Sequence, residues 1–96
     1  MEKIYKEAGC LFVKFSKETL EELKKLPVEE VFVSCETFEK IKKILNLEIR
    51  TAEELIAVRN SVVRELTKND DRDDWTRMSM IVCVIDKEKI KRGMAV

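Results

Sequence analysis

The stretch KNDDRDDWTRMSMIVCVIDKEKIKRG, which runs from Lys68 to Gly93, decides how the chain folds. Its aspartates suggest a cation-binding loop, and the apolar block after them suggests a buried strand. A calcium loop of the EF-hand type needs a glycine at its sixth position and a glutamate at its twelfth. Counted from Asp70 or Asp71, neither residue falls there. We therefore expect no metal site, and we interpret the aspartates as the start of a helix.

The two ends of this stretch carry the signals of one long helix, from about Asp74 to Arg92. Asp73 or Asp74 can cap its first turn, and negative charge is favourable near the positive end of the helix dipole. Gly93 follows at the place where a helix usually ends in the left-handed conformation, which glycine adopts without strain. Cations are favourable in the last turns, which contain Lys87, Lys89, Lys91 and Arg92.

A second interpretation stays open for the apolar block of this stretch, Met78 to Ile85. Only Ser79 in it is polar, so the block is also compatible with a fully buried strand. As a helix it is apolar on every side: Met80 and Cys83 point away from the face shared by Trp75, Met78, Val82 and Ile85. Such a helix must lie at the centre of a small domain or be covered by a partner.

Four residues of this region are therefore candidates for a protein interface. A tryptophan at the start of a helix is easily left at the edge of a small core, and methionine side chains adapt to irregular contacts. The alternative is that the same side chains complete the core. We predict that contacts with a target protein, or with a second copy of the chain, are made by Trp75, Met78, Met80 and Cys83.

The first half of the chain predicts two short strands with a helix between them. The apolar runs CLFVKF (Cys10–Phe15) and EVFVSC (Glu30–Cys35) contain β-favouring residues. Ser16 can cap the helix and Pro27 stops it, and its length permits a right-handed crossover that makes the two strands parallel. The apolar positions of this helix are Leu20, Leu23 and Leu26.

Two further helices are expected in the middle of the chain. Ser34 or Thr37 can cap the first, and Asn46 can end it in the left-handed conformation. Thr51 with Glu54 is a capping box, which predicts the start of the second. Their apolar stripes contain Phe38, Ile41, Ile44, Leu45, Leu55, Val58, Val62 and Leu66. The expected fold class is thus α+β: one small domain, residues 1–96, with two short parallel strands, about four helices and a central C-terminal helix.

The composition indicates a globular domain in a reducing compartment. Of 96 residues, 45% are apolar and 40% are charged, which separates the chain from disordered sequences. No apolar run approaches the length of a membrane span, so a cytoplasmic protein is expected. The three cysteines lie far apart in apolar surroundings. We predict that they are reduced core residues; they are Cys10, Cys35 and Cys83.

Most catalytic and cofactor-binding chemistry has no signal in this sequence. The chain lacks histidine, which excludes His-ligated zinc and Ser-His-Asp arrangements. It contains neither a C-x-x-C pair nor a phosphate-binding glycine loop. Cys35 is the one candidate for thiol reactivity, because the positive end of a helix favours a thiolate. A buried structural cysteine is nevertheless the commoner outcome. We expect no enzyme activity and no cofactor.

Nucleic-acid binding is the alternative function. Lys40, Lys42 and Lys43 form one basic cluster, and residues 87–92 form another. Glutamates are interleaved with both clusters, and 19 basic and 19 acidic residues give a formal net charge of zero. The electrostatic attraction that drives non-specific binding to nucleic acid is therefore weak. A protein partner is favoured over nucleic acid.

The C-terminal stretch WTRMSMIVCVID, with Gly93 after it, resembles the endings of small uncharacterised proteins encoded by phages and prophages of AT-rich bacteria. The resemblance covers about the last third of the chain and implies no activity and no site residue. It implies a setting, because small phage proteins often bind and block a host machine, including nuclease-based defence systems. The sequence thus favours a small non-catalytic interaction protein that acts by occupying a surface.

Overall fold

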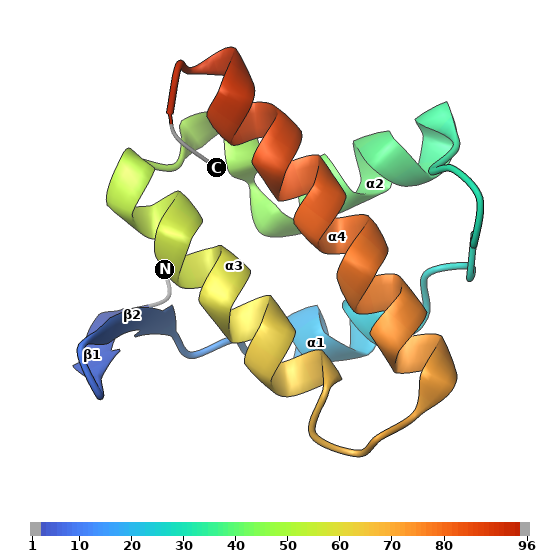
Figure 1. The fold of residues 1–96 in the computed structure, drawn as a ribbon, viewed down its shortest axis with the longest axis horizontal. Helices are drawn as coiled ribbons and strands as arrows, with labels where there is room; N and C mark the ends of the chain where they lie inside the picture. The colour runs from blue at the N-terminus through green and yellow to red at the C-terminus, as the bar shows by residue number, and fades with distance from the viewer. Residues whose placement is uncertain (1–2, 95–96) are drawn as a thin grey trace.

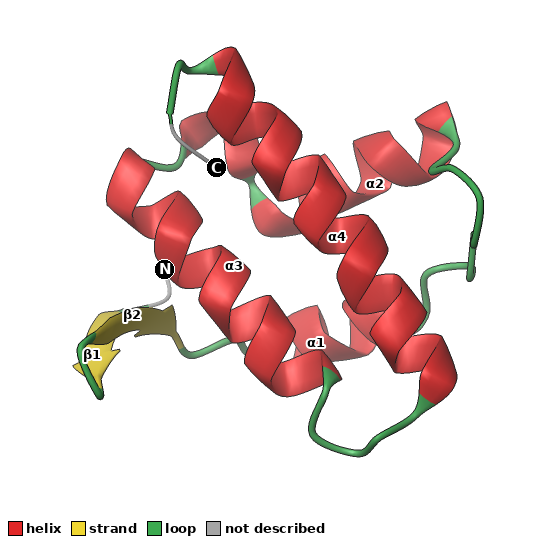
Figure 2. Ribbon diagram, viewed as in Figure 1, coloured by secondary structure: helices red, strands yellow, loops and turns green. Residues whose placement is uncertain are grey.

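The chain folds into an N-terminal β-hairpin followed by four α-helices, over the residues 3–94 that the structure, a computed structural model, describes. The elements are β1 (Ile4–Glu7), β2 (Cys10–Val13), α1 (Lys17–Lys24), α2 (Cys35–Leu45), the short 3₁₀ helix η1 (Leu47–Ile49), α3 (Ala52–Leu66) and α4 (Arg72–Lys91). Figures 1 and 2 show α3 and α4 as an antiparallel pair, with α1 and α2 behind it. The predicted α+β class is confirmed.

The C-terminal stretch forms a single helix, as its end signals predict. α4 begins after Asp71, whose carboxylate accepts hydrogen bonds from the N–H groups of Asp73 and Asp74 at 2.8 and 3.2 Å. The cap thus lies slightly earlier than predicted. Gly93 follows the helix with a φ of 76°, the left-handed conformation expected there. The alternative of a strand over 78–85 is wrong.

α4 lies at the centre of the helical contacts, but one side of it faces solvent. It packs against the three other α-helices, and Ile81 and Ile85 on its inner face are fully buried. On the outer face Trp75 is 45% exposed and Ile90 is 62% exposed. The helix thus contacts all three other α-helices, but the described part of the chain leaves its outer face uncovered and does not enclose it as a central helix would be enclosed.

The helix boundaries follow the capping signals. Ser16 and Ser34 cap α1 and α2, each accepting a hydrogen bond from a backbone N–H three residues later. Asn46 ends α2 in the left-handed conformation, with a φ of 51°. Thr51 and Glu54 form both hydrogen bonds of the capping box that begins α3. The side chains of Ser16, Ser34, Thr51 and Glu54, and the backbone N–H of Asn46, bond backbone groups that a helix end would otherwise leave without partners.

The strands differ from the prediction in partner and in direction. β1 and β2 form an antiparallel hairpin, with Ile4 opposite Val13. Ala8 and Gly9 at its turn have φ values of 51° and 80°, the positive values that a tight hairpin turn requires. The predicted second strand, Glu30–Cys35, is instead a loop that leads into the start of α2, so the expected parallel pair does not form. All four residues of β1 are exposed, and no apolar pattern marks this strand in the sequence.

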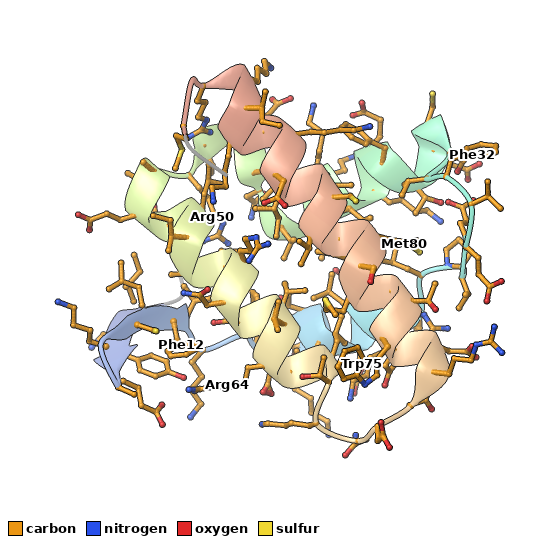
Figure 3. The ribbon with its side chains drawn as sticks, in the orientation of Figure 1. Phe12, Phe32, Arg50, Arg64, Trp75 and Met80 are labelled. Carbon is orange, nitrogen blue, oxygen red and sulfur yellow. The ribbon has the colours of Figure 1, made fainter. Side chains whose placement is uncertain are left out.

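The hairpin is held on α3 by side chains of that helix. The hydroxyl of Ser61 accepts a hydrogen bond from the N–H of Val13 at 2.8 Å and donates one to the carbonyl of the same residue at 2.9 Å. The guanidinium of Arg64 lies 3.6 Å from the ring centroid of Phe12 and pairs with Glu7 at 2.9 Å (Figure 3). The hairpin is thereby fixed at the opposite edge of the molecule from the loop between α1 and α2 (Figure 1).

The prediction that the cysteines are core residues is wrong, because Cys10, Cys35 and Cys83 are all exposed. Cys83 shows the physical reason. Successive residues of a helix are rotated by about 100°, so Cys83 points to solvent while its neighbour Val84 is only 1% exposed. An apolar neighbourhood along the chain is thus not an apolar neighbourhood in space.

Candidate interaction surface

Two adjacent large apolar side chains project from the α1–α2 loop, residues 26–34. Val31 is 92% exposed and Phe32 is 75% exposed. Figure 3 shows Phe32 at the edge of the molecule, beside the start of α2. Single exposed apolar residues are common on protein surfaces, whereas contiguous apolar surface on a loop points to an interaction site. The pair therefore marks the α1–α2 loop as the candidate surface.

The loop is fastened to α4 by two hydrogen bonds of its backbone. The Nε of Arg77 donates a hydrogen bond of 2.7 Å to the carbonyl of Leu26. The N–H of Glu29 donates one of 3.4 Å to the Sδ of Met80, a weak acceptor that is otherwise surrounded by protein. The loop therefore has a fixed place beside α4.

The loop is also closed on itself by Glu29. Its carboxylate accepts hydrogen bonds from the N–H and the hydroxyl of Ser34, at 3.0 and 3.3 Å. The Oγ of Ser34 in turn accepts the N–H of Thr37 and so caps α2. The bond from the Ser34 N–H lowers the pKa of Glu29 below its ordinary value. Val31 and Phe32 lie between these fixed points, so a partner that binds them has little loop entropy to remove.

Lowering the pH is expected to break the hydrogen bonds between Glu29 and Ser34. Because the pKa of Glu29 is lowered in the folded protein, the closure stabilises the fold above the unfolded-state pKa of 4.5 and is lost as the pH falls through the folded-state value. In an NMR titration, the amide signal of Ser34 should move with a midpoint below 4.5, and the step should be absent in Glu29→Gln. A midpoint at or above 4.5, or a step that persists in Glu29→Gln, would contradict this assignment.

A groove, here named the loop–α4 groove, lies between the α1–α2 loop and α4. Its volume is about 290 Å³. This is near the lower limit of the roughly 300–1,000 Å³ found for small-molecule sites, so the groove suits one or two side chains of a partner. Glu29, Glu30 and Lys87 add charges of both signs to it. Its apolar lining consists of Val31, Phe32, Val33, Phe38, Met80, Cys83 and Val84.

The structure brings two of the four predicted interaction residues into the groove. Met80 and Cys83 both line it, although Met80 is only 4% exposed and Cys83 is open to solvent. Met78 is half-buried and packs against the core. Trp75 is exposed but does not line the groove, and in Figure 3 α4 separates it from Phe32.

Val31 and Phe32 are not predicted as surface residues, because the run Glu30–Cys35 is predicted to be a strand. Three neighbouring signals favour a loop: Pro27, the two glutamates after it, and Ser34, which is a good helix cap. A strand also needs a neighbour. β2 is paired with β1 on one side and bonded to Ser61 on the other, so it offers no open edge to a third strand.

Metal-binding and membrane-spanning features are absent from residues 3–94. Within this range no group of three or more Cys, Asp or Glu side chains could hold a metal ion. No helix in the described part of the chain is long and apolar enough to cross a membrane. Cys35, the candidate for thiol chemistry, is exposed at the first residue of α2, and the chain has no histidine to activate it.

Comparison with known proteins gives no match from which a role for the surface could be inferred. No protein-family model matches the chain, and no curated protein or solved structure matches it significantly. The surface consists of exposed apolar side chains, an adjoining groove, and charged side chains of both signs.

Proposed function

We propose that the protein is a small non-catalytic protein-interaction module, whose contact surface is the α1–α2 loop together with the loop–α4 groove. The observation that carries the proposal is the exposure of Val31 and Phe32 on a loop that is held in place by hydrogen bonds. Aromatic side chains near the centre of an interface are frequent anchors of binding, and apolar surface around them excludes water. A preformed loop strengthens such an anchor because little order has to be created on binding.

The resemblance of the C-terminal stretch to phage proteins supports a setting for this module. We propose that it acts in the cytoplasm as a phage-encoded inhibitor, which blocks a host machine such as a nuclease-based defence system by covering part of its surface. A chain of 96 residues is large enough, because a standard interface buries only about 800 Å² on each partner. Self-association through the same surface is the second form that the proposal takes.

Nucleic acid is the weaker candidate partner, because the basic cluster of α2 is neutralised locally. Lys42 is paired with Glu48 at 3.0 Å, and the bond between them raises the pKa of the lysine and lowers that of the glutamate. A phosphate chain on this face would meet carboxylates beside the lysines. The hollow along α2, about 520 Å³ in volume, is lined by Glu36, Glu39, Lys40, Lys42, Lys43, Asn46, Glu48 and Ile49.

Replacing Phe32 by serine is expected to weaken partner binding strongly and to leave the fold intact. The side chain is 75% exposed, so its loss should change the free energy of unfolding by less than about 1 kcal/mol. Removing an anchor from an interface commonly costs about 2 kcal/mol or more, which is roughly a thirtyfold loss of affinity. The measurement is capture from a bacterial lysate by the immobilised chain, followed by titration of the captured protein.

Ile49→Ser is the matched control for this experiment. Ile49 is also 75% exposed, but it lies in η1 and does not line the loop–α4 groove. It should bind as the unchanged chain does. Sedimentation velocity at several concentrations shows whether the partner is a second copy, in which case Phe32→Ser should yield monomers. Equal binding by the two variants would refute the proposal, as would a strictly monomeric chain that captures no protein.

A further inference from the structure

The loop–α4 groove adjoins a second hollow, which lies between α2 and α4. The second hollow has a volume of about 200 Å³ and is lined by these two helices. The residues common to both hollows are Phe38, Val84 and Lys87. We call the combined feature the α2–α4 crevice. Its first end is apolar, beside Phe32, and its second end is basic.

Ammonium groups gather around one aromatic ring at the basic end. The Nζ atoms of Lys42 and Lys87 lie 5.7 and 5.4 Å from the centroid of the Phe38 ring, within the range of a cation–π attraction. Lys91 lines the same hollow. Lys42 is already paired with Glu48 at 3.0 Å. The ring therefore keeps Lys87 at the crevice. The charge of Lys87 is more available to a partner than the charge of Lys42, which is paired with Glu48.

Two lysines at this end remain open to an anion. Lys87 and Lys91 are exposed, and neither forms an ion pair within 4.0 Å in the range 3–94. The bond from Lys42 and, more weakly, the charge of Lys91 lower the pKa of Glu48. Glu88, the acidic side chain of the same hollow, is 7% exposed and lies 3.5 Å from Arg92. The carboxylate of Glu88 is thus directed to its own cation, and the basic end can accept the negative charge of a ligand.

The apolar end has the opposite electrostatic character. The carboxylate of Glu29 is bonded to Ser34, and Glu30 pairs with Arg72 at 3.2 Å. The side chains of Glu30 and Arg72 are 59% and 86% exposed, so solvent screens their attraction. The carboxylates of Glu29 and Glu30 offer no attraction to a negative ligand at this end, whereas the apolar lining favours an apolar side chain. The crevice therefore matches a ligand that is apolar at one end and acidic at the other.

We propose that the partner segment in the α2–α4 crevice is a linear acidic peptide, in which a large apolar side chain stands near one or two carboxylates. This inference rests on the proposed function and names the chemistry of the partner. The apolar side chain occupies the end beside Phe32 and Met80, and the carboxylates lie against Lys87 and Lys91. Nucleic acid fits less well, because its evenly spaced phosphates would also face Glu30.

A randomised library of short linear peptides, displayed on cells and selected with the full chain, tests the inference. Enriched peptides should combine a large apolar residue with Asp or Glu and should be poor in Lys and Arg. In fluorescence anisotropy with one enriched peptide, Lys87→Glu and Phe32→Ser should each raise the dissociation constant by about tenfold or more. Lys40→Glu is the control, since Lys40 is a lysine of α2 that lines neither hollow of the crevice.

The outcomes separate this inference from the proposed function. Enrichment of basic peptides, of uncharged apolar peptides or of no peptide would overturn the inference, as would equal effects of Lys87→Glu and Lys40→Glu. Displacement of the peptide by a DNA or RNA oligonucleotide that itself depends on Lys87 would overturn it in favour of nucleic acid. If a captured protein is lost by Phe32→Ser but retained by Lys87→Glu, the proposed function holds and the acidic-peptide inference fails.

Discussion

Replacing Met80 by alanine is expected to lower the free energy of unfolding by about 2–4 kcal/mol, or the midpoint temperature by roughly 10–25 °C. The residue is 4% exposed and lines the loop–α4 groove, so its truncation removes buried contacts and enlarges the groove under the α1–α2 loop. Its Sδ also accepts the N–H of Glu29, and the truncation removes that partner. Because a small domain is stable by only about 5–15 kcal/mol, a loss of this size is a large part of the total.

Met80→Leu separates packing from hydrogen bonding at this position. Leucine has a similar volume, and such exchanges usually cost less than about 1.5 kcal/mol. It has no atom that accepts a hydrogen bond from Glu29. In thermal and urea unfolding, Met80→Leu should therefore stay close to the unchanged protein, while hydrogen exchange at the Glu29 amide becomes faster. A loss below about 1 kcal/mol for Met80→Ala would show that Met80 is not the buried support of the loop.

The helices are predictable from the sequence because their ends carry local signals. A capping side chain bonds backbone groups only a few residues away, so Thr51 with Glu54 marks the start of α3 whatever the rest of the chain does. Gly93 marks the end of α4 by another local effect, because glycine adopts the left-handed conformation without strain. These end signals identify α4 as a helix even though its apolar block also fits a strand.

The strands are harder to predict because their pairing is not local. β2 is completed by β1 on one side and by Ser61, 48 residues away from Val13, on the other. The run EVFVSC has the composition of a strand but no neighbour to pair with. Glu29 instead turns back to Ser34 and closes a loop. Local propensity alone does not reveal this arrangement.

Part of the candidate surface is predictable from the composition of α4, and the rest depends on where the α1–α2 loop lies. The excess of apolar residues in α4 correctly indicates that some of them reach the surface, and Met80 and Cys83 do line the groove. Val31 and Phe32 supply the most exposed apolar area of that surface, yet their exposure depends on how the loop lies over α4. Only the three-dimensional arrangement shows which side of each residue remains uncovered.

A partner that occupies the loop–α4 groove should protect the thiol of Cys83 from alkylation. Cys83 lines the groove and is exposed in the free protein. Cys10 is also exposed, but it lies on β2 and does not line the groove, so a single experiment read by mass spectrometry contains its own control. With the captured partner at about ten times its dissociation constant, alkylation of Cys83 should slow by about tenfold.

Differential alkylation of Cys83 and Cys10 is the most direct measurement of where the partner binds. If the partner covers the groove, the rate at Cys83 falls on binding and the rate at Cys10 stays within about twofold of its free value. If Cys83 reacts equally fast in the complex and in the free protein, while bound partner is present, the loop–α4 groove is not the interaction surface.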